Sequence, residues 1–221
     1  MLKLGIKYVE AKSLEPTEKK GGSTWRWVLE LVVLFAAVFI ITQLLMTFVI
    51  SKDEVQGSSM EPGLQQNDRL ISLRHKQIKR NDIVVVYAPD ATDKATGKPE
   101  LYIKRVIGMP GDTVQSKNDK LYINGKLVKQ PYLHKKFMRK EIKAIAAQEG
   151  LDASKVKFTY DFSLKTLKST HRTKVPKGEY FVMGDNRIIS HDGRAFGFLK
   201  RSQIQSVVVM RYWPMSKFKF Y

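Results

Sequence analysis

The 221-residue chain contains no cysteine. This absence excludes disulfide scaffolds, thiolate metal sites and cysteine nucleophiles. Histidine is scarce too, and no two of its four residues stand at the spacing of a zinc-binding helix, so the sequence predicts no metal site. The four are His75, His134, His171 and His191.

Acidic residues are also few: 21 Asp and Glu stand against 39 Lys and Arg, which gives a net charge of +18 spread along the chain. A charge of this sign suits nucleic acid, anionic lipid or an anionic cell-wall polymer. The sequence has neither an aromatic RNA-binding signature nor zinc-finger spacing. We therefore expect no nucleic-acid partner, and a basic surface that faces anionic lipid or wall polymer.

Residues 28–50 form the one long apolar run, which is long enough to span a bilayer as a helix. Trp25 and Trp27 precede it where an aromatic belt lies, and the basic residues of segment 1–27 predict a cytoplasmic amino terminus with the remainder extracytoplasmic. A cleaved signal peptide is the alternative, but the run is too long and no clear Ala-x-Ala site follows it. The sequence predicts a single-pass anchor in the cell membrane, with the lipid bilayer as partner. Its polar interruptions are Glu30, Thr42, Gln43 and Thr47.

After Lys52 the sequence changes to short β-rich runs separated by turn residues. The continuous apolar run at 83–87 fits a buried strand, Asn124-Gly125 is a strong hairpin signal, and 90–99 reads as a polar loop. Residues 138–150 have apolar side chains at helical spacing, with Gly150 as the stop. We expect a mainly β domain over 51–221 with this one helical excursion. The predicted strands are 69–73, 83–87, 101–107, 121–123, 126–128, 179–183 and 204–212.

The segment Gly57-Ser58-Ser59-Met60-Glu61-Pro62 is a short polar turn that follows the apolar run. Glycine permits a tight or positive-φ path and proline fixes its own φ, so the turn is a rigid mount for a nucleophile. Such turns are most often only structural. If Ser59 is a nucleophile it needs a base, because a serine hydroxyl is barely nucleophilic at neutral pH.

The candidate base is Lys104. Strand alternation places it on the same face as Tyr102 and Val106, opposite Ile103 and Arg105. A lysine pressed into apolar surroundings loses its charge preferentially and can act as a base near neutral pH. The alternative is an ordinary edge-strand lysine whose ammonium group lies in solvent.

Four segments in order resemble the characteristic boxes of type I signal peptidases. They are Gly57–Pro62, Lys79–Val85, Tyr102–Asp112, and Gly184–Arg187 followed by Ser190, Asp192, Arg194, Phe196 and Gly197. The resemblance covers roughly residues 25–212, least closely at 130–175. The single short anchor and Gly57 are similar to the Gram-positive form.

The resemblance implies a membrane-bound serine endopeptidase with a β fold. Such an enzyme removes signal peptides from exported preproteins after small residues (Ala-x-Ala) and needs no metal or organic cofactor. By position, Ser59 is the nucleophile and Lys104 the neutral general base of a Ser/Lys dyad, and Ser190 hydrogen-bonds and orients the lysine. The other implied roles are a turn shaped by Met60 and Pro62, an Arg105–Asp185 pair and an Asp192–Arg194 pair.

Three glycines depart from the family's pattern. Gly63 replaces a threonine, and Gly193 replaces the serine of Asp-Ser-Arg. Gly57 stands where some members carry a serine hydroxyl that donates to the oxyanion. We therefore expect backbone N–H groups of the turn, that of Ser59 included, to form most of the oxyanion hole. Ser58 lies at a different offset and is given no such role.

Other functions are weighed against this one. A catalytically inactive, membrane-anchored basic β-domain that binds anionic wall polymer or lipid would leave Ser59 and Lys104 merely structural. A self-cleaving Ser/Lys repressor is disfavoured by the apolar run and by the lack of a DNA-reading helix. An inactive paralogue is disfavoured because Ser59, Lys104 and Ser190 are all present.

Overall fold

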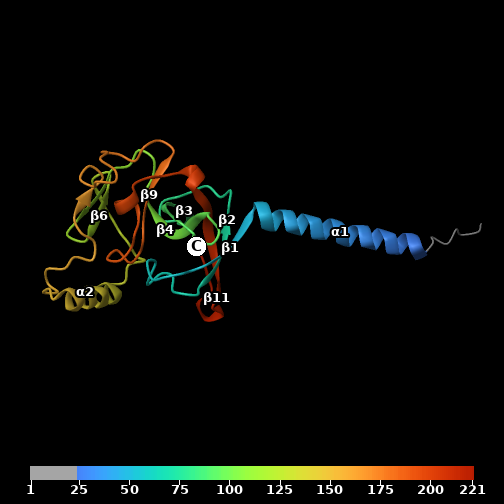
Figure 1. The fold of residues 1–221 in the computed structure, drawn as a ribbon, viewed down its shortest axis with the longest axis horizontal. Coiled ribbons are helices and arrows are strands. Elements are labelled where there is room, and N and C mark those ends of the chain that lie inside the picture. The colour runs from blue at the N-terminus through green and yellow to red at the C-terminus, as the bar shows by residue number, and fades with distance from the viewer. Residues whose placement is uncertain (1–23) are drawn as a thin grey trace, which may run out of the picture. The chain divides into compact units, whose positions relative to one another are not determined.

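The computed structural model describes residues 24–221 (Figure 1). Residues 1–23, most of the predicted cytoplasmic tail, lie outside the described residues. The chain divides into two units, Met1–Gln43 and Leu44–Tyr221, and each is described by itself.

Helix α1 runs from Thr24 to Phe48, whereas the sequence predicted a span from Val28 to Ile50. By length and composition it can cross a membrane: its most apolar window has a mean hydropathy of 2.6, and none of that window is buried. The hydroxyl of Thr42 donates to the carbonyl of Val38 at 2.8 Å, so this polar interruption is satisfied within the helix. Ile50 belongs to the first strand, not to the helix.

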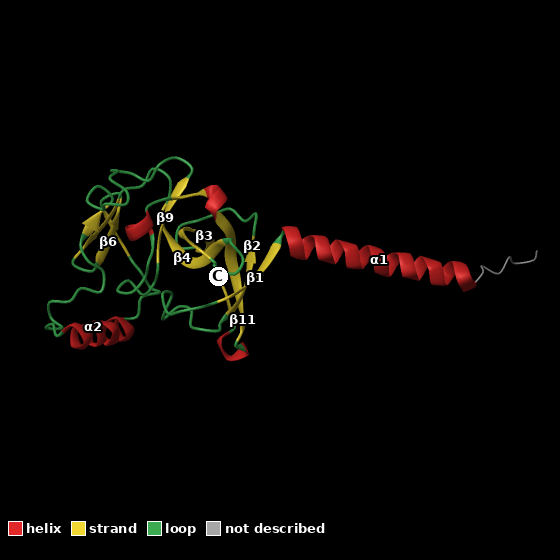
Figure 2. Ribbon diagram, in the orientation of Figure 1, coloured by secondary structure: helices red, strands yellow, loops and turns green. Residues whose placement is uncertain are grey.

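In the described part of Leu44–Tyr221, eight strands form the main sheet, in the order β1-β2-β11-β3-β4-β9-β10 with β12 beside β11. All of these pairs are antiparallel. The sequence prediction of a mainly β fold is confirmed (Figure 2). The bounds are β1 Ile50–Glu54, β2 Arg69–Leu73, β3 Ile83–Thr92, β4 Pro99–Gly108, β9 Glu179–Met183, β10 Leu199–Lys200, β11 Ile204–Trp213 and β12 Lys219–Phe220.

A smaller antiparallel sheet has the order β7-β6-β5-β8. Its hairpin turns at Asn124 and Gly125, which both have positive φ (52° and 74°), as the Asn-Gly signal predicted. Its strands are β5 Val114–Lys117, β6 Lys120–Ile123, β7 Lys126–Val128 and β8 Phe162–Ser163.

The helices of Leu44–Tyr221 are short apart from α2, Lys135–Glu149. Gly150 caps α2 in the left-handed conformation (φ 66°) as predicted, but the helix begins at Lys135 rather than Met138. The remaining short helices of the described chain are α3 Gly193–Phe196, η1 Arg201–Gln203 and η2 Met215–Lys217.

Strand β3 is buried on both faces, as its apolar run predicted. Val84 and Val86 belong to one apolar core, while Ile83 and Val85 belong to another. Because side chains alternate along a strand, these cores lie on opposite faces of the main sheet. A third core, with Phe162 and Phe181 among its members, joins the smaller sheet to β9.

The predicted polar loop at 90–99 is wrong at both ends. Strand β3 continues to Thr92 and β4 begins at Pro99, and these two residues pair, so a hairpin arm extends from the sheet. The turn at its tip is closed by the Asp93 carboxylate, which accepts backbone N–H bonds from Ala95 and Thr96, each 2.8 Å. Backbone pairing tolerates exposed polar side chains, which hid the arm from a hydrophobic pattern.

Candidate active site

The turn that carries Ser59 is fixed on both sides of the serine. Gly57 has a φ of 79°, and its N–H donates to Gln66 Oε1 at 2.5 Å. Met60 is 1% exposed in a core with Leu64, whose N–H donates to the Met60 carbonyl at 2.9 Å. Ser59 is thereby held between an exposed turn and a buried anchor, as the motif predicted.

Lys104 reaches this serine from strand β4. Its Nζ donates to Ser59 Oγ at 3.1 Å and lies 5.2 Å from the centre of the Tyr102 ring. Only 4% of the lysine is exposed, so the alternative of a solvated edge lysine is wrong. The predicted facing is also found, because Tyr102 packs on one core and Ile103 on the other.

The electrostatic state of Lys104 follows from its burial. Desolvation lowers its pKa from 10.5 to about 8, and the carboxylate of Asp192 partly opposes this shift. A substantial fraction of the amine is therefore neutral slightly above neutral pH. A neutral amine has a lone pair that can accept the proton of Ser59.

Arg105, the next residue of β4, forms the predicted pair with Asp185. Its Nε and Nη2 donate to the two carboxylate oxygens at 2.7 and 2.6 Å, and Asp185 is fully buried. Burial alone lowers the pKa of Arg105, but the bonds to Asp185 outweigh it and raise that pKa. The guanidinium also stacks on the Tyr132 ring at 4.0 Å. This pair joins β4 to the segment that follows β9.

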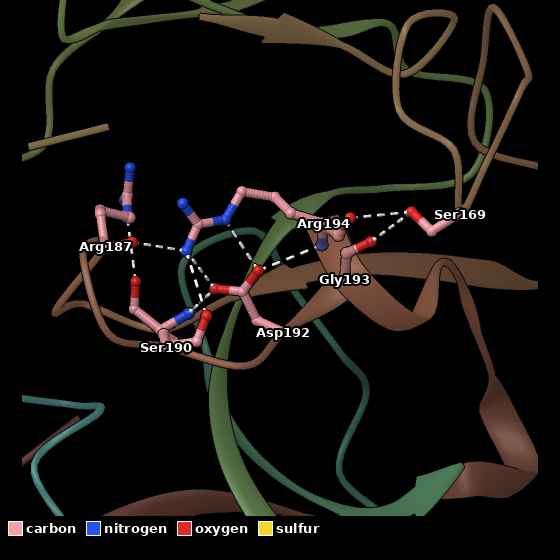
Figure 3. A network of polar contacts seen from close by, with 7 residues as sticks. Ser169, Arg187, Ser190, Asp192, Gly193 and Arg194 are labelled. Carbon is pink, nitrogen blue, oxygen red and sulfur yellow. Dashed lines mark hydrogen bonds and ion pairs between the residues drawn. The ribbon is translucent and has the colours of Figure 1, made fainter. Parts of the chain in front are cut away.

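The predicted Asp192–Arg194 pair is present as well (Figure 3). Arg194 Nε and Nη2 each lie 2.9 Å from a carboxylate oxygen of Asp192, and the N–H of Gly184 donates to the same carboxylate at 2.9 Å. Burial raises the pKa of Asp192, but the bonds and charge of Arg194 outweigh it and lower that pKa. Arg194 Nη2 also donates to the Arg187 carbonyl at 2.8 Å. The ion pair therefore cross-links both ends of the 184–194 loop.

Ser190 lies in this loop without the contact that the resemblance implies. Within residues 24–221, its Oγ is buried and has no hydrogen-bond partner, so the bond to Lys104 is absent from the structure. The backbone of Ser190 is fixed instead: its N–H donates to the Asn186 carbonyl at 3.1 Å.

The loop and the turn that carries Ser59 are joined directly. The N–H of Asn186 donates to the Ser59 carbonyl at 2.9 Å. Gly184 permits this approach, because a Cβ there would lie 2.6 Å from the Ser59 carbonyl oxygen and would collide with the Ser190 side chain. Gly184 is thus required by close packing rather than by a turn.

Two departures from the family's pattern have steric explanations. A Cβ on Gly193 would lie 2.7 Å from the Val182 carbonyl oxygen and 3.0 Å from the Phe181 ring, so the usual serine does not fit. A Cβ on Gly63 would lie 2.9 Å from Asp185 Oδ2, inside the space of the Arg105–Asp185 pair.

Some contacts of the site were missed by sequence reasoning. Arg187 is fully buried and donates to Gln130 Oε1 at 2.6 Å, and Asn186 donates to Glu141 of α2 at 3.2 Å. Asn186 and Arg187 belong to the last of the four sequence segments, so the sequence did indicate the loop residues of these contacts. The partners come from the 130–175 region, which carried no motif.

Ser59 and Lys104 open into a cleft of about 880 Å³. One wall is formed by residues 52–60 and another by β4 and the loop after β9. Within β4, strand β9 pairs only with the 105–108 segment, so in the described chain residues 99–104 of β4 have no strand partner on that side. A free strand edge such as this one, beside Ser59, can bind an extended peptide. The walls of the cleft include Leu101, Tyr102, Ile103, Ile189 and His191.

Comparison with known proteins gives the family. The sequence pattern of the family described as "Signal peptidase, peptidase S26" matches residues 25–213. The chain belongs to this family. The prediction of a signal-peptidase-type serine endopeptidase, made from four sequence segments, is thereby confirmed.

Individual relatives agree. The chain is 40% identical over 207 residues to a signal peptidase I of Bacillus caldolyticus, covering 92% of this chain and 97% of that one. It is 34% identical over 200 residues to a signal peptidase IB of Staphylococcus aureus (strain MRSA252), covering 88% and 92%. A crystal structure of a signal peptidase I from Enterococcus faecalis V583 is 36% identical, covers 60% of this chain and 97% of that chain, and has a TM-score of 0.47.

Proposed function

We propose that this signal peptidase cleaves signal peptides from exported preproteins after Ala-x-Ala, with Ser59 as nucleophile and Lys104 as general base. The observation that carries the proposal is the 3.1 Å contact between Lys104 Nζ and Ser59 Oγ, which both line an open cleft. Membership of the family supports the reaction class.

Acylation begins with neutral Lys104. Its lone pair takes the Ser59 proton while Oγ attacks the scissile carbonyl carbon, and the carbonyl π electrons move to oxygen. The tetrahedral intermediate collapses, the C–N bond breaks, and the Lys104 ammonium returns the proton to the leaving amine. The signal peptide remains as an ester on Ser59. Water, deprotonated by Lys104, then hydrolyses the ester and restores both side chains.

The oxyanion is stabilised by backbone N–H groups of the nucleophile turn, Ser59's own included. Gly57 has no hydroxyl to contribute and its N–H donates to Gln66 Oε1, but Ser58 and Ser59 line the cleft. The two buried ion pairs, Arg105–Asp185 and Asp192–Arg194, do not touch the substrate. They hold β4 and the 184–194 segment in place around the lysine.

Substrate binding uses the free edge of β4. An extended signal peptide forms strand hydrogen bonds along residues 99–104, and its small side chains enter the apolar walls of the cleft. Helix α1 anchors the enzyme in the membrane with the amino terminus in the cytoplasm. The hydrophobic segment of the substrate occupies the same membrane, which raises the effective concentration of each for the other.

The test is cleavage of a preprotein with an Ala-x-Ala site by the detergent-solubilised full chain. Ser59→Ala and Lys104→Ala should be inactive, while Lys120→Ala, an exposed lysine of the smaller sheet, should match the parent. Cleavage by either active-site variant at the parental rate would contradict the mechanism. Inertness of all four proteins on several such preproteins would contradict the function.

A further inference from the structure

The hairpin arm and the loop after β9 meet at an exposed contact between an aspartate and a histidine. Asp90 lies on the part of β3 that forms the arm, and His191 lies between Ser190 and Asp192. His191 Nε2 is 2.5 Å from Asp90 Oδ2, and the two side chains are 54% and 40% exposed.

Two aromatic rings fix the imidazole further. The His191 ring packs edge-on against Tyr102, with centroids 6.2 Å apart at 87°, and against Phe196 at 5.7 Å and 65°. Edge-to-face contacts of this kind are favourable. Held by Asp90, Tyr102 and Phe196, the ring is positioned although half of it is exposed.

The imidazole stands in the wall of the catalytic cleft. His191 and Tyr102 both line the cleft that contains Ser59 and Lys104. The Tyr102 ring, which packs against His191, also lies 5.2 Å from Lys104 Nζ. A substrate bound along the free edge of β4 therefore lies beside Tyr102 and His191.

His191 does not act as the base. Its bonded nitrogen is directed to Asp90, and in residues 24–221 the side-chain partner of Ser59 is Lys104. A Ser-His-Asp relay is therefore not formed, and the His–Asp pair has another use.

We propose that His191, held by Asp90, determines specificity by closing the cleft beside Tyr102 and limiting the size of the substrate side chain that packs there. Alternate side chains of an extended peptide face the same wall, so this limit applies to one substrate position and not to its neighbours. Asp90 is the positioning residue: without its carboxylate the imidazole can turn towards solvent. The inference rests on the proposed function and adds a determinant of its substrate choice.

The experiment uses the full-length enzyme in detergent and a set of peptides based on an Ala-x-Ala site. Single positions on both sides of the cut are changed in turn to Ala, Val, Leu or Phe, and kcat/KM is measured. At one position, His191→Ala should raise the Leu-to-Ala ratio about tenfold or more, since each methylene in a fitted pocket changes selectivity by such factors. Asp90→Asn should raise it less at the same position, and His191→Phe should keep the limit.

The matched control is Lys157→Gln. Lys157 and Asp161 form an ion pair of similar exposure (42% and 43%) at 2.7 Å, and neither residue lines the cleft. This variant should keep the parental ratio at every position. Tm is measured for all variants so that unfolding is not mistaken for altered selectivity.

The possible outcomes distinguish the specificity role of His191 from the peptidase function itself. An equal fall in kcat/KM for all peptides, or unchanged ratios in His191→Ala, would overturn the specificity role while leaving the peptidase intact. If the parent cleaves none of the peptides or a full preprotein, the proposed function fails and this inference fails with it.

Discussion

Two buried regions of the Leu44–Tyr221 unit differ in the chemistry of their side chains: one is mainly apolar and the other contains charged groups. The core beneath the smaller sheet is built mainly from apolar side chains, such as Leu121, Phe162 and Phe181. The region around Ser59 instead buries Lys104, which is 4% exposed, together with two arginine–aspartate pairs. Apolar burial stabilises a fold directly, whereas a buried charge costs stability unless it is paired and hydrogen-bonded.

The buried charges around Ser59 differ in how their burial is compensated. Arg105, Asp185, Asp192 and Arg194 are paired, so their burial is compensated. Lys104 has a serine hydroxyl as its hydrogen-bond partner instead of a carboxylate, and its pKa is lowered to about 8 as a result of burial. Lys104 has no directly bonded counter-ion, and it is the group that the proposed mechanism needs neutral.

The largest expected effect is that of Lys104→Met, which should abolish cleavage and yet stabilise the fold. Below about pH 8 the parent keeps a buried ammonium, and the shift from 10.5 corresponds to about 3 kcal/mol at 1.36 kcal/mol per unit. The gain should shrink between pH 8 and 10.5, where the unfolded chain still binds the proton that the folded chain has released. Denaturant unfolding at pH 7 and 10 measures it, and a loss of stability at pH 7 would contradict the burial argument.

Asp185→Ala and Phe162→Ala form a matched pair across the two regions. Each should lower the free energy of unfolding by about 3–5 kcal/mol, the first by leaving Arg105 buried without a counter-charge and the second by opening a cavity. Only Asp185→Ala should also lower kcat for the folded fraction, because only it releases β4 beside Lys104. Equal kcat values, measured below the unfolding temperature of both, would show that the pair is not linked to the site.

Gly193→Ala and Gly193→Ser should each destabilise the fold by about 1–3 kcal/mol, as overpacking does. The clash is at Cβ, against the Val182 carbonyl and the Phe181 ring, so the serine hydroxyl should add little. Thermal unfolding compares them with the parent. A Gly193→Ser variant as stable as the parent would mean that the glycine is not sterically required.

The smallest change in stability is expected for Ser190→Ala. Its buried Oγ has no partner in the described chain, so removing it should leave Tm unchanged or raise it slightly. If Ser190 orients Lys104 during the reaction, kcat should fall at constant Tm. A falling Tm with unchanged kcat would assign the hydroxyl a structural role instead.

Sequence reasoning named Ser59 and Lys104, which are in contact in the structure, but it did not name the residues around them. Ser59 and Lys104 stood in recognisable segments, and strands with clear patterns, such as 69–73 and 179–183, have the predicted bounds. Strand β1 was missed because its polar residues pair with β2 through the backbone, which no side-chain pattern reports. Strand β5 was also missed. Its side chains alternate between buried and exposed as in a half-buried strand, but one of the buried ones, Ser116, is polar and gave no hydrophobic signal.

Long-range contacts explain the remaining gaps. The Glu141–Asn186 and Gln130–Arg187 bonds join segments that are distant in the sequence, and no local spacing predicts them. The same holds for Asp90 and His191, which become neighbours only because the arm of β3 extends to the loop after β9. The glycine departures likewise acquired a reason only from the atoms around them.

The most direct test of the proposed Ser59–Lys104 dyad is the pH dependence of kcat/KM for an Ala-x-Ala peptide. A base that must lose a proton, with a pKa of about 8, predicts a tenfold rise per pH unit on the acidic side and a plateau above pH 8. A profile that stays flat from pH 5 to 10 with chemistry rate-limiting would contradict Lys104 as the base.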